Sequence, residues 1–449
     1  MTYKSYENYK DSGIEWIDEI PEHWEIRKMK NLIFFQEGPG LRNWQFADSG
    51  IRVICVTNIT EKGIDFSNYE KFISEEEYKQ MYQHFTVNSG DLLLSSSGNS
   101  WGKVAEYLDD ETVILNTSTI RINENKDFGS ILTQSFIKWS LQSEAVREQL
   151  GLMMTGSCQP NFGPTHLAKV LVPFPTSLKE QRLIADYLDK KISRIDENIT
   201  KNKKLISLLE EKKTALINQA VTKGLNPNVP MKDSGIEWIG EIPEHWNIRK
   251  NKFLLEKITD GSHTSVEIID DGYPYVTVTD LDEERESVDV ENSKKISKKD
   301  YNLLLRNGCK PSIGDILFSQ IGTVGLVVPV DERDDYVLLS SIAILTPSNN
   351  INRRWLIYFL KSINIKYQWK NYMAGGAVKR ITLNHISNFQ IAIPPLSEQN
   401  EISKFLDKKI KKINKTIYKI KRNIDLLEEY RVSLIHHTVT GKIDVRDEI

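Results

Sequence analysis

The sequence contains one segment twice, and this repeat limits the folds that the chain can adopt. Residues 10–30 read KDSGIEWIDEIPEHWEIRKMK and residues 232–252 read KDSGIEWIGEIPEHWNIRKNK, so 18 of 21 positions are identical at an offset of 222. The segment LDKKI also recurs, at 188–192 and 406–410, with an offset of 218. The chain is therefore one unit of about 220 residues written twice, which predicts two similar lobes rather than a single core.

The middle of each copy diverges but keeps a common skeleton. Residues 56–58 (VTN) correspond to 278–280 (VTD), and residues 90–95 (GDLLLS) correspond to 314–319 (GDILFS). The stretches between these framework positions differ. Because loops on a rigid scaffold carry recognition, two lobes with one fold and different loops are expected to bind two related ligands.

Each copy ends in a long helical pattern that contains neither proline nor glycine. Its seam positions alternate in steps of four and three for more than four heptads, which is typical of a coiled coil. The seam residues are Leu188, Ile192, Ile195, Ile199, Asn202, Ile206, Leu209, Lys213, Leu216 and Ala220 in the first copy, and Leu406, Ile410, Ile413, Ile417, Ile420, Ile424, Leu427, Arg431, Leu434 and Thr438 in the second. Each helix is expected to span roughly 65 Å, for about 45 residues at 1.5 Å per residue. Polar seam residues such as Asn202 usually fix the register at some loss of stability.

These two helices can pair in two ways. A parallel coil between two chains would make a homodimer. We prefer pairing within one chain, because tethering through a lobe gives the two helices a high effective concentration. An antiparallel coiled coil would then relate the two lobes by a pseudo-twofold axis.

The lobes themselves are expected to mix helix and strand. Short alternating strands, with helical patterns near 130–150 and 351–372, predict a twisted sheet and a supporting helix. The predicted class is therefore α+β, with two α/β lobes in tandem separated by two long helices. The predicted segments are 1–176 for the first lobe, 177–224 for the first long helix, 225–395 for the second lobe, and 396–449 for the second long helix and the C-terminal tail.

Composition and charge exclude several classes of protein. No apolar run reaches the roughly 18 residues that a membrane helix needs, and the three separated cysteines form neither a disulfide framework nor a zinc ligand set. The N-terminus lacks the apolar stretch of a signal peptide, so we expect a cytoplasmic protein. The net charge of −3 argues mildly against a free-standing DNA binder. The long helices are nevertheless basic, with eleven basic and seven acidic side chains over 178–224 and eleven and six over 396–442.

No catalytic signature survives inspection. Residues 97–104, SGNSWGKV, resemble a phosphate-binding loop but lack its first glycine and the hydroxyl that binds Mg²⁺. The motifs of zinc proteases and serine hydrolases do not occur, nor does the Asn/Asp-Pro-Pro-aromatic tetrapeptide of amino-methyltransferases. We interpret His436 and His437, near a helix end, as a cap or dipole contact rather than a metal pair. The chain is not expected to be an enzyme, or to hold a cofactor or metal of its own.

Taken together, these segments resemble the specificity (S) subunit of type I restriction–modification systems. The resemblance covers nearly the whole chain. It rests on the repeated opening DSGIEWI-x-EIPEHW (Asp11–Trp24 and Asp233–Trp246), the Gly-Asp segments 90–95 and 314–319, and the Glu-Gln pairs at the helix entries (Pro175–Gln181 and Pro395–Gln399). No single motif is decisive, but their order, repeated twice and followed each time by heptad helices, is specific.

The resemblance implies a non-catalytic subunit that binds double-stranded DNA. Each lobe would be a target recognition domain that reads one half of a split, asymmetric sequence, and the helices would set the spacing between the halves. The helices would also dock two modification (methyltransferase) subunits, with restriction (endonuclease and translocase) subunits as further partners. S-adenosylmethionine, ATP and Mg²⁺ would then belong to the partner subunits, in a system that defends the cell against foreign DNA.

Polar side chains in the divergent loops are the candidate DNA contacts, because Arg, Lys, Asn and Gln bind phosphates and base edges. The candidates are Arg42, Asn43, Gln45, Asn99, Trp101, Lys103, Gln159 and Asn161 in the first lobe, and His263, Thr264, Gln320, Thr323, Lys379 and Arg380 in the second. The stretches 37–46 (EGPGLRNWQF) and 259–264 (TDGSHT) match segments common in the family. A structural turn is the alternative for residues 42–45, loop packing is the alternative for His263, and a half-buried packing role is the stronger expectation for Trp101.

The near-identical EIPEHW segments have a different interpretation. The side chains that read the DNA sequence should differ between the two lobes. Segments preserved in both lobes are therefore expected either to support the framework or to dock partners. Two other functions also remain open: a duplicated coiled-coil scaffold that binds only proteins, and an enzyme with an unrecognised motif. Copurification with a methyltransferase, together with sequence-dependent adenine methylation, distinguishes these functions.

Overall fold

The chain forms two compact units in a computed structural model that describes residues 3–125, 129–154, 160–332, 335–373 and 380–448. Unit 1 contains residues 1–202 and 421–449, and unit 2 contains residues 203–420. Each unit combines one globular lobe with one half of each long helix. We call residues 3–176 lobe 1 and residues 225–395 lobe 2; the linear division into four segments stays a prediction.

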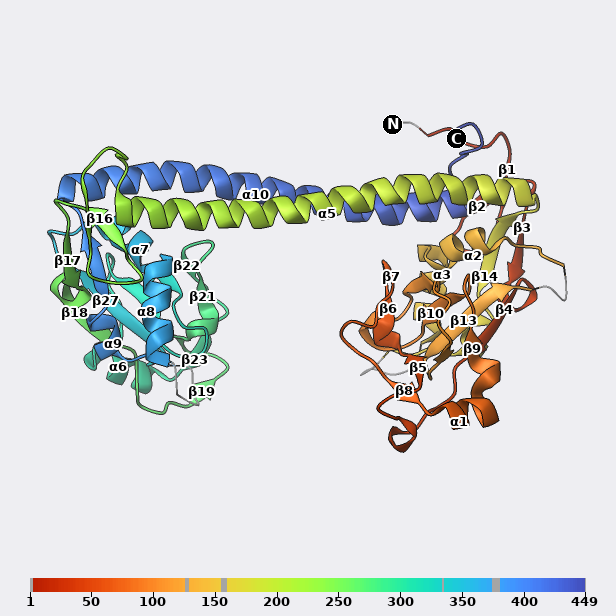
Figure 1. Cartoon of the computed structure of the whole chain (residues 1–449), viewed down its shortest axis with the longest axis horizontal. Coiled ribbons are helices and arrows are strands. Elements are labelled where there is room, and N and C mark those ends of the chain that lie inside the picture. The colour runs from red at the N-terminus through yellow and green to blue at the C-terminus, as the bar shows by residue number, and fades with distance from the viewer. Residues whose placement is uncertain (1–2, 126–128, 155–159, 333–334, 374–379, 449) are drawn as a thin grey trace. The chain divides into compact units, whose positions relative to one another are not determined.

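Lobe 1 consists of short strands and short helices (Figure 1). Its strands are β1 (Tyr9–Asp11), β2 (Glu19–Pro21), β3 (Trp24–Lys28), β4 (Ile33–Glu37), β5 (Ile51–Ile54), β6 (Ile59–Thr60), β7 (Gly63–Ile64), β8 (Phe72–Ile73), β9 (Thr86–Val87), β10 (Leu92–Ser95), β11 (Val104–Glu106), β12 (Val113–Leu115), β13 (Thr119–Glu124) and β14 (Leu171–Pro175). Its helices are α1 (Glu75–Glu77), α2 (Gln134–Leu141), α3 (Glu144–Met153) and α4 (Pro164–Leu167). The described strands form sheets in the orders β11-β10-β13-β4 and β8-β5-β12-β9.

Lobe 2 repeats this plan with local differences. Its strands are β15 (Met231–Asp233), β16 (Glu241–Pro243), β17 (Asn247–Lys250), β18 (Leu255–Asp260), β19 (Ile268–Ile269), β20 (Tyr273–Val276), β21 (Leu281–Asp282), β22 (Ser287–Val288), β23 (Lys294–Ile296), β24 (Ile316–Ser319), β25 (Val327–Pro329), β26 (Val337–Leu338), β27 (Ile342–Pro347) and β28 (Gln390–Ile393). Its helices are α6 (Lys298–Arg306), α7 (Arg353–Leu360), α8 (Ile363–Met373) and α9 (Leu383–Ser387). The sheet β25-β24-β27-β18 matches β11-β10-β13-β4 strand for strand. The second sheets share one parallel pair, β5–β12 and β20–β26, but differ at their edges.

The helices that support each first sheet begin at side-chain caps. Thr133 accepts a hydrogen bond from Phe136 N before α2, and Asn352 accepts one from Trp355 N before α7. Phe136 and Trp355 are both fully buried against their lobes. The predicted α+β class is confirmed; each stretch expected to form one supporting helix forms two short helices, α2 and α3 in lobe 1 and α7 and α8 in lobe 2.

The Gly-Asp segments form the central buried strands. Every residue of β10 and of β24 is buried, as expected for a short continuous apolar run with both faces covered. The preceding aspartates lock the turn: Asp91 Oδ2 accepts from Asn88 N at 2.8 Å, and Asp315 Oδ2 accepts from Ser312 N at 2.7 Å. The recurrence of this segment is therefore explained by the framework.

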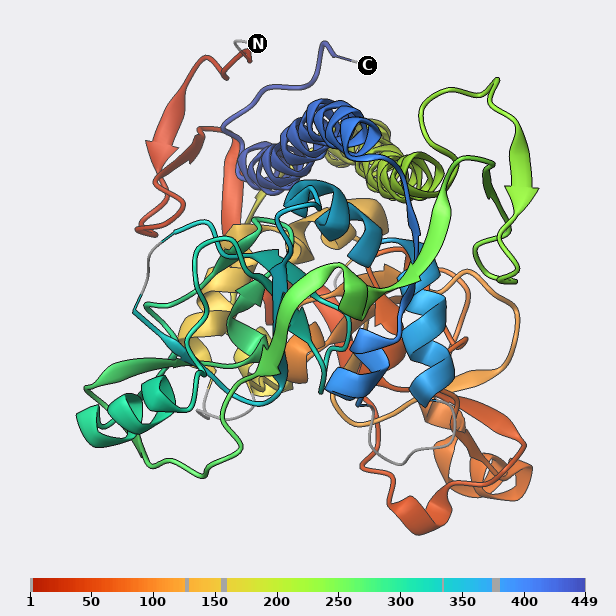
Figure 2. The same cartoon turned by 90° about the vertical axis from the view of Figure 1, so that its left-hand side faces the viewer.

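The heptad stretches form the two long helices, α5 (Leu178–Lys223) and α10 (Leu396–Val439). Every predicted seam residue is buried or half-buried, and the exposed side chains lie between them. The two helices lie side by side within each unit (Figures 1 and 2). Among the described residues, no helix is both long and apolar enough to span a bilayer.

The pairing of these helices is antiparallel and lies within one chain. In unit 1 the first half of α5 meets the second half of α10, where Arg431 Nε donates to Asp196 Oδ1 at 3.0 Å. In unit 2 the second half of α5 meets the first half of α10, where Ala220 and Leu406 share one buried cluster. The prediction of an intramolecular antiparallel pair is confirmed.

The EIPEHW segments anchor each lobe to the start of a long helix. Trp24 Nε1 donates to Glu180 Oε1 at 3.0 Å, and Trp246 Nε1 donates to Glu398 Oε2 at 3.0 Å. Both indoles are fully buried. These tryptophans therefore belong to the framework, which is one of the two roles expected for the segment.

Candidate nucleic-acid interface

Three chain segments meet at one end of the first sheet in lobe 1. β4 and β10 both run antiparallel to β13, so the ends of β4 and β10 lie beside the start of β13. Backbone hydrogen bonds from Gly38 N to Thr119 O (3.0 Å) and from Ser96 N to Ser118 O (2.9 Å) hold these segments together. We call this end of the sheet, with the loops that leave it, rim 1.

A segment distant in sequence joins rim 1. Ser97 and Asn161 form an isolated β-bridge, and Gly98 N donates to Pro160 O at 3.1 Å. The predicted residues at 42–45, at 99–103 and at 161 therefore come from three separate stretches that leave or join the same end of one sheet. Sequence reasoning proposed these sets separately and did not predict that they meet.

Lobe 2 has the same arrangement at the ends of β18 and β24 and the start of β27, which we call rim 2. Gly261 N donates to Ile342 O at 3.1 Å, joining the first and last of these strands. Ile321 and Arg380 form the isolated bridge that corresponds to Ser97 and Asn161. The framework is thus common to both rims, and the side chains that it presents are different.

A glycine at the same place in each rim lets two chain segments approach closely. A Cβ atom at Gly38 would overlap the carbonyl of Asn116, and one at Gly261 would overlap the carbonyl of Leu338. Neither glycine has a positive φ, so the requirement is for space rather than for a left-handed backbone. This accounts for Gly38 in the segment GPGLR and for Gly261 in the segment DGSH.

The loop after β4 presents two of the predicted residues and is held by a third. Arg42 and Asn43 are exposed. Gln45 Nε2 donates to Glu77 Oε1 at 3.0 Å and to Tyr82 OH at 2.8 Å, while Gln45 Oε1 accepts from Arg42 N at 2.9 Å. Gln45 therefore fixes the loop, and Arg42 and Asn43 carry the polar groups that face solvent.

The second and third sets of rim 1 contain exposed and packed side chains. Asn99 and Asn161 are exposed, and Lys103 is half-buried. Trp101 is also half-buried, with the guanidinium of Arg147 at 4.7 Å from the centre of its ring. This packing occupies one face of the indole, as expected for a structural tryptophan.

Most of the predicted residues in rim 2 are at the surface. His263, Thr264, Thr323 and Arg380 are exposed, and His263 Nε2 lies 2.9 Å from Asp260 Oδ2. Gln320 is only 3% exposed, and its amide donates to Ser340 O at 3.2 Å. Contact between Gln320 and a base would need this bond to break, so its DNA role stays a prediction without support from the geometry.

Two predicted residues, Gln159 and Lys379, lie outside the described residues. Of the predicted cations, Arg42, Lys103 and Arg380 have no ion-pair partner within the described part of the chain. Their charges are therefore available to an external anion.

Sequence reasoning missed the most exposed aromatic side chain near rim 1. Trp44 is 80% exposed, between Asn43 and Gln45 in the loop that follows β4. The available signal was a tryptophan inside a polar turn, RNWQ, where no helical or strand pattern of apolar residues predicts a buried side chain. Its position next to Arg42 adds an aromatic surface to the polar groups of the rim.

The described residues also include side chains of the kinds that hold metal ions or act as nucleophiles. No group of three or more His, Cys, Asp or Glu side chains in this part of the chain is placed to hold a metal ion. Burial raises the pKa of the Cys55 thiol and the pKa of the Cys309 thiol, which keeps both protonated and weakly nucleophilic near neutral pH. The rims instead offer hydrogen-bond donors and acceptors at the surface.

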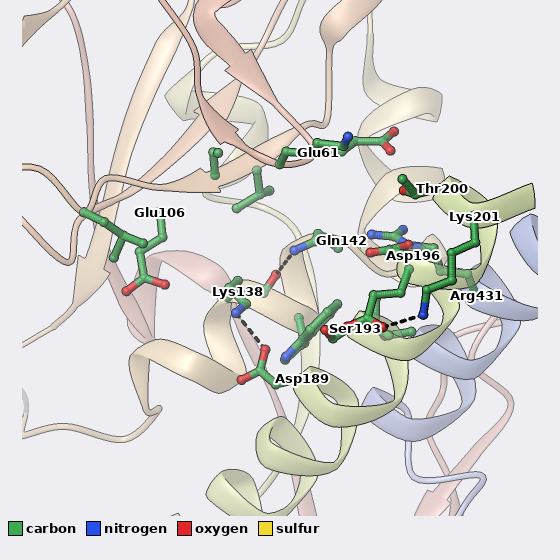
Figure 3. Close-up of a pocket in the computed structure, with 18 residues that line it drawn as sticks. Glu61, Glu106, Lys138, Gln142, Asp189, Ser193, Asp196, Thr200, Lys201 and Arg431 are labelled. Carbon is green, nitrogen blue, oxygen red and sulfur yellow. Dashed lines mark hydrogen bonds and ion pairs between the residues drawn. The ribbon is translucent and has the colours of Figure 1, made fainter. Parts of the chain in front are cut away.

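A cavity of about 620 Å³ lies between lobe 1 and α5 within unit 1 (Figure 3). Lys138 Nζ on α2 reaches Asp189 Oδ1 on α5 at 2.8 Å, and Arg431 reaches Asp196 at 3.0 Å. These charges neutralise one another inside the cavity wall. We therefore interpret this cavity as part of the joint between lobe and helix rather than as a ligand site.

Comparison with known proteins finds specificity subunits of type I restriction enzymes among the relatives of this chain. The chain is 26% identical over 462 residues to the putative type I restriction enzyme MjaX specificity subunit of Methanocaldococcus jannaschii, with 99% of each chain covered. It is 25% identical over 245 residues to the type I restriction enzyme EcoBI specificity subunit of Escherichia coli, covering 53% of this chain and 50% of that one. A solved structure described as "Structural basis underlying complex assembly and conformational transition of the type I R-M system" shares the fold, with a TM-score of 0.69, 15% identity, and coverage of 94% of this chain and 99% of that chain.

A family model matches the chain twice, once in each copy of the sequence repeat. The model for the type I restriction modification DNA specificity domain matches residues 21–209 and again residues 243–422. Each match contains most of one lobe and most of the long helix that follows it. The chain therefore belongs to the type I restriction modification DNA specificity domain family.

Proposed function

We propose that this protein is the sequence-specific DNA-binding specificity subunit of a type I restriction–modification complex. Each lobe reads one half of a bipartite, asymmetric site through its own rim. The observation that carries this is the pair of equivalent rims, in which one framework presents different side chains: Arg42, Asn43 and Asn99 in rim 1, and His263, Thr323 and Arg380 in rim 2. Identical rims would suit a palindrome, whereas different rims suit two unlike half-sites.

The two long helices serve in this proposal as the spacer between the half-sites. Support comes from their uninterrupted length, since α5 and α10 each cross from one unit to the other without a break. A stiff spacer fixes the number of base pairs between two readers far better than a flexible linker does. Changing its length by whole heptads should therefore change the spacing that is recognised.

The chemistry of the complex is proposed to belong to partner subunits in the cytoplasm. Two modification subunits would supply S-adenosylmethionine-dependent methylation, and restriction subunits would supply ATP- and Mg²⁺-dependent cleavage. The relatives are named as specificity subunits of type I restriction enzymes, which supports such partners for this chain. This chain itself would direct the partners to DNA and hold no cofactor.

Methylation mapping tests the proposed function. The chain is co-expressed with the type I modification subunit of its own genome in a host that lacks both, and adenine methylation is mapped across the host genome. We expect one bipartite motif with a fixed spacer, absent when this chain is omitted. A chimera in which lobe 2 replaces lobe 1 should convert the motif to an inverted repeat of the half-site read by lobe 2.

The alternative function, a protein-interaction scaffold without DNA specificity, predicts a different result. In that case methylation would be absent, or its sequence would not change when one lobe is exchanged. The different side chains of the two rims favour the DNA-reading function, because a symmetric scaffold has no need for them.

A further inference from the structure

We propose that Trp44 is an aromatic wedge that stacks against a base step in the half-site read by lobe 1. This inference rests on the proposed function and names one residue that would set affinity and local DNA shape. Wedges of this kind unstack a base step and bend the duplex, and they need a rigid loop and a side chain free of protein contacts. The loop that carries Trp44 provides both.

The loop is anchored on each side of Trp44. Leu41 and Phe46 pack against the buried cluster that contains Val53 and Ile114. Between these anchors, residues Asn43–Gln45 form one turn of 3-10 helix. The backbone at position 44 is therefore held in place, so the entropy cost of ordering the loop is met before any ligand binds.

The three glutamates of α1, which lies beside the loop, are already engaged. Glu77 accepts a hydrogen bond from Gln45 at 3.0 Å, Glu75 pairs with Lys79 at 3.2 Å, and Glu76 accepts from Gln80 at 3.0 Å. Each carboxylate thus has a donor of its own. The exposed guanidinium of Arg42 remains free to contact the DNA next to the wedge.

The indole of Trp44 has no packing role that would explain it. At 80% exposure it leaves almost all of a large apolar surface in water, and tryptophan at such positions commonly marks a binding surface. Trp101, the tryptophan among the candidate contacts from the sequence, has the guanidinium of Arg147 over its ring and is half-buried. The free aromatic face of rim 1 therefore belongs to Trp44.

Lobe 2 offers a built-in comparison, because the corresponding loop carries His263 and Thr264 and no tryptophan. A wedge at Trp44 should distort one half-site only. The distortion should therefore be asymmetric along the DNA, which a general effect of protein binding would not produce.

The test uses the complex of this chain with its modification subunits, bound to a duplex that contains the motif found by methylation mapping. 2-Aminopurine is placed at successive positions in each half-site, and Kd is measured over a range of salt concentrations. For Trp44→Ala we expect Kd to rise by about 10- to 100-fold, the range for loss of one base–aromatic stack, with the salt slope unchanged because no charge is lost. Base flipping by the modification subunits should change the 2-aminopurine emission at the methylated adenines with either protein. Beyond these positions, the wild-type complex should change the emission at one further step of one half-site, and Trp44→Ala should abolish that change alone.

Two further variants control for non-specific effects. Trp44→Phe retains an aromatic ring and should recover most of the affinity. Phe253→Ala removes another aromatic side chain, 63% exposed, just before β18 and so at the opposite end of the sheet from rim 2; it should leave both Kd and emission unchanged. Thermal unfolding of Trp44→Ala should match the wild type, since the side chain is exposed.

The outcomes separate the wedge from the proposed function. If Trp44→Ala binds and methylates the mapped motif as the wild type does, the wedge is refuted and the DNA-reading function stands. A smaller salt slope in Trp44→Ala, without loss of the emission change, would also refute stacking, because it indicates a charge contact. Absence of any methylated motif with the wild-type chain would overturn both proposals.

Discussion

Trp24 Nε1 donates a hydrogen bond to Glu180 Oε1 at 3.0 Å, joining lobe 1 to the first turn of α5 across 156 positions of sequence. The same carboxylate accepts from Tyr6 OH at 2.9 Å and lies 3.0 Å from His23 Nε2. The buried carboxylate of Glu180, in the first turn of α5, thus binds both the N-terminal segment and the EIPEHW segment.

Replacing Glu180 with Ala should destabilise unit 1 by about 3 kcal/mol, because it leaves the Tyr6 hydroxyl and the Trp24 indole N–H buried without an acceptor. Burial and the Glu180 carboxylate raise the pKa of Tyr6 far above its ordinary value, so Tyr6 remains a donor at any working pH. The measurement is the midpoint of urea unfolding. Glu398→Ala is the matched control: its carboxylate is 33% exposed, against 7% for Glu180, and among the described residues it accepts hydrogen bonds from His245 and Trp246, so we expect a loss of about 1 kcal/mol. Equal losses in the two variants would contradict this account.

The EIPEHW segments show where sequence reasoning reaches its limit. Their near identity predicted a role shared by both lobes, but the residues alone left framework and docking equally open. The distance between Trp24 and Glu180 decides this for the tryptophan, and that distance depends on how residues far apart in the chain are brought together. Heptad spacing, by contrast, is a local property, so each seam residue from Leu188 to Thr438 was predictable and is buried or half-buried.

Acid should weaken the fold through His436. Burial lowers the pKa of His436 and the adjacent His437 lowers it further, as does Lys442, while Glu144 on α3 opposes them. The unfolded chain then binds a proton that the folded chain excludes, so stability is lost as pH falls below about 6.5, the ordinary pKa of histidine. The Nδ1 atom of His436 is also buried without a hydrogen-bond partner among the described residues.

His436→Gln removes this titration. We expect the unfolding free energy of the wild type to fall between pH 7.5 and pH 5.5, and the fall to be smaller in His436→Gln, as measured by urea unfolding at each pH. His84→Gln, at an exposed position in lobe 1, is the control and should retain the dependence of the wild type. A His436→Gln protein with the full acid sensitivity of the wild type would rule out this histidine as the cause.

Asn202 interrupts the seam of α5 between Ile199 and Ile206, and its side chain is half-buried. Asn202→Ile should raise the free energy of unfolding by about 1 kcal/mol, because it buries apolar surface where an amide now sits. Without the amide, the two helices should be less restricted to one register and one pairing partner. Pairing between chains would then appear as self-association in sedimentation. Lys204→Ile adds an apolar side chain at an exposed position and should bring no gain in stability. A less stable Asn202→Ile protein would mean that the amide makes a favourable contact in the seam.

The candidate site was predictable in its residue types and less so in its geometry. Exposed cations and amides in divergent loops, such as Arg42 and Arg380, are found at the rims because loops on this framework leave the sheet at one end. Gln45 and Gln320 have the same chemistry but bond to the protein itself, which only tertiary contacts decide. Trp44 was missed because tryptophan in a sequence is more often buried than exposed.

Cations in the two rims should affect different halves of the target. Arg42→Ala should weaken binding to the mapped motif by about 1–3 kcal/mol and relax the sequence requirement in one half-site, if its guanidinium contacts a base edge. Arg380→Ala should do the same in the other half-site, because it lies on the other lobe. Competition binding with duplexes mutated in either half-site measures both effects.

Lys103 should contribute differently from the two arginines, because a lysine that meets a phosphate supplies affinity without sequence information. Lys103→Ala should lower affinity for all sequences alike and reduce the slope of log Kd against log salt by about 1. Lys252→Ala, just before β18 and so at the end of the sheet opposite rim 2, is the control and should change neither affinity nor slope. If Arg42→Ala and Arg380→Ala altered the same half-site, or if Lys103→Ala relaxed specificity instead of the salt slope, the assignment of one rim to each half-site would be wrong.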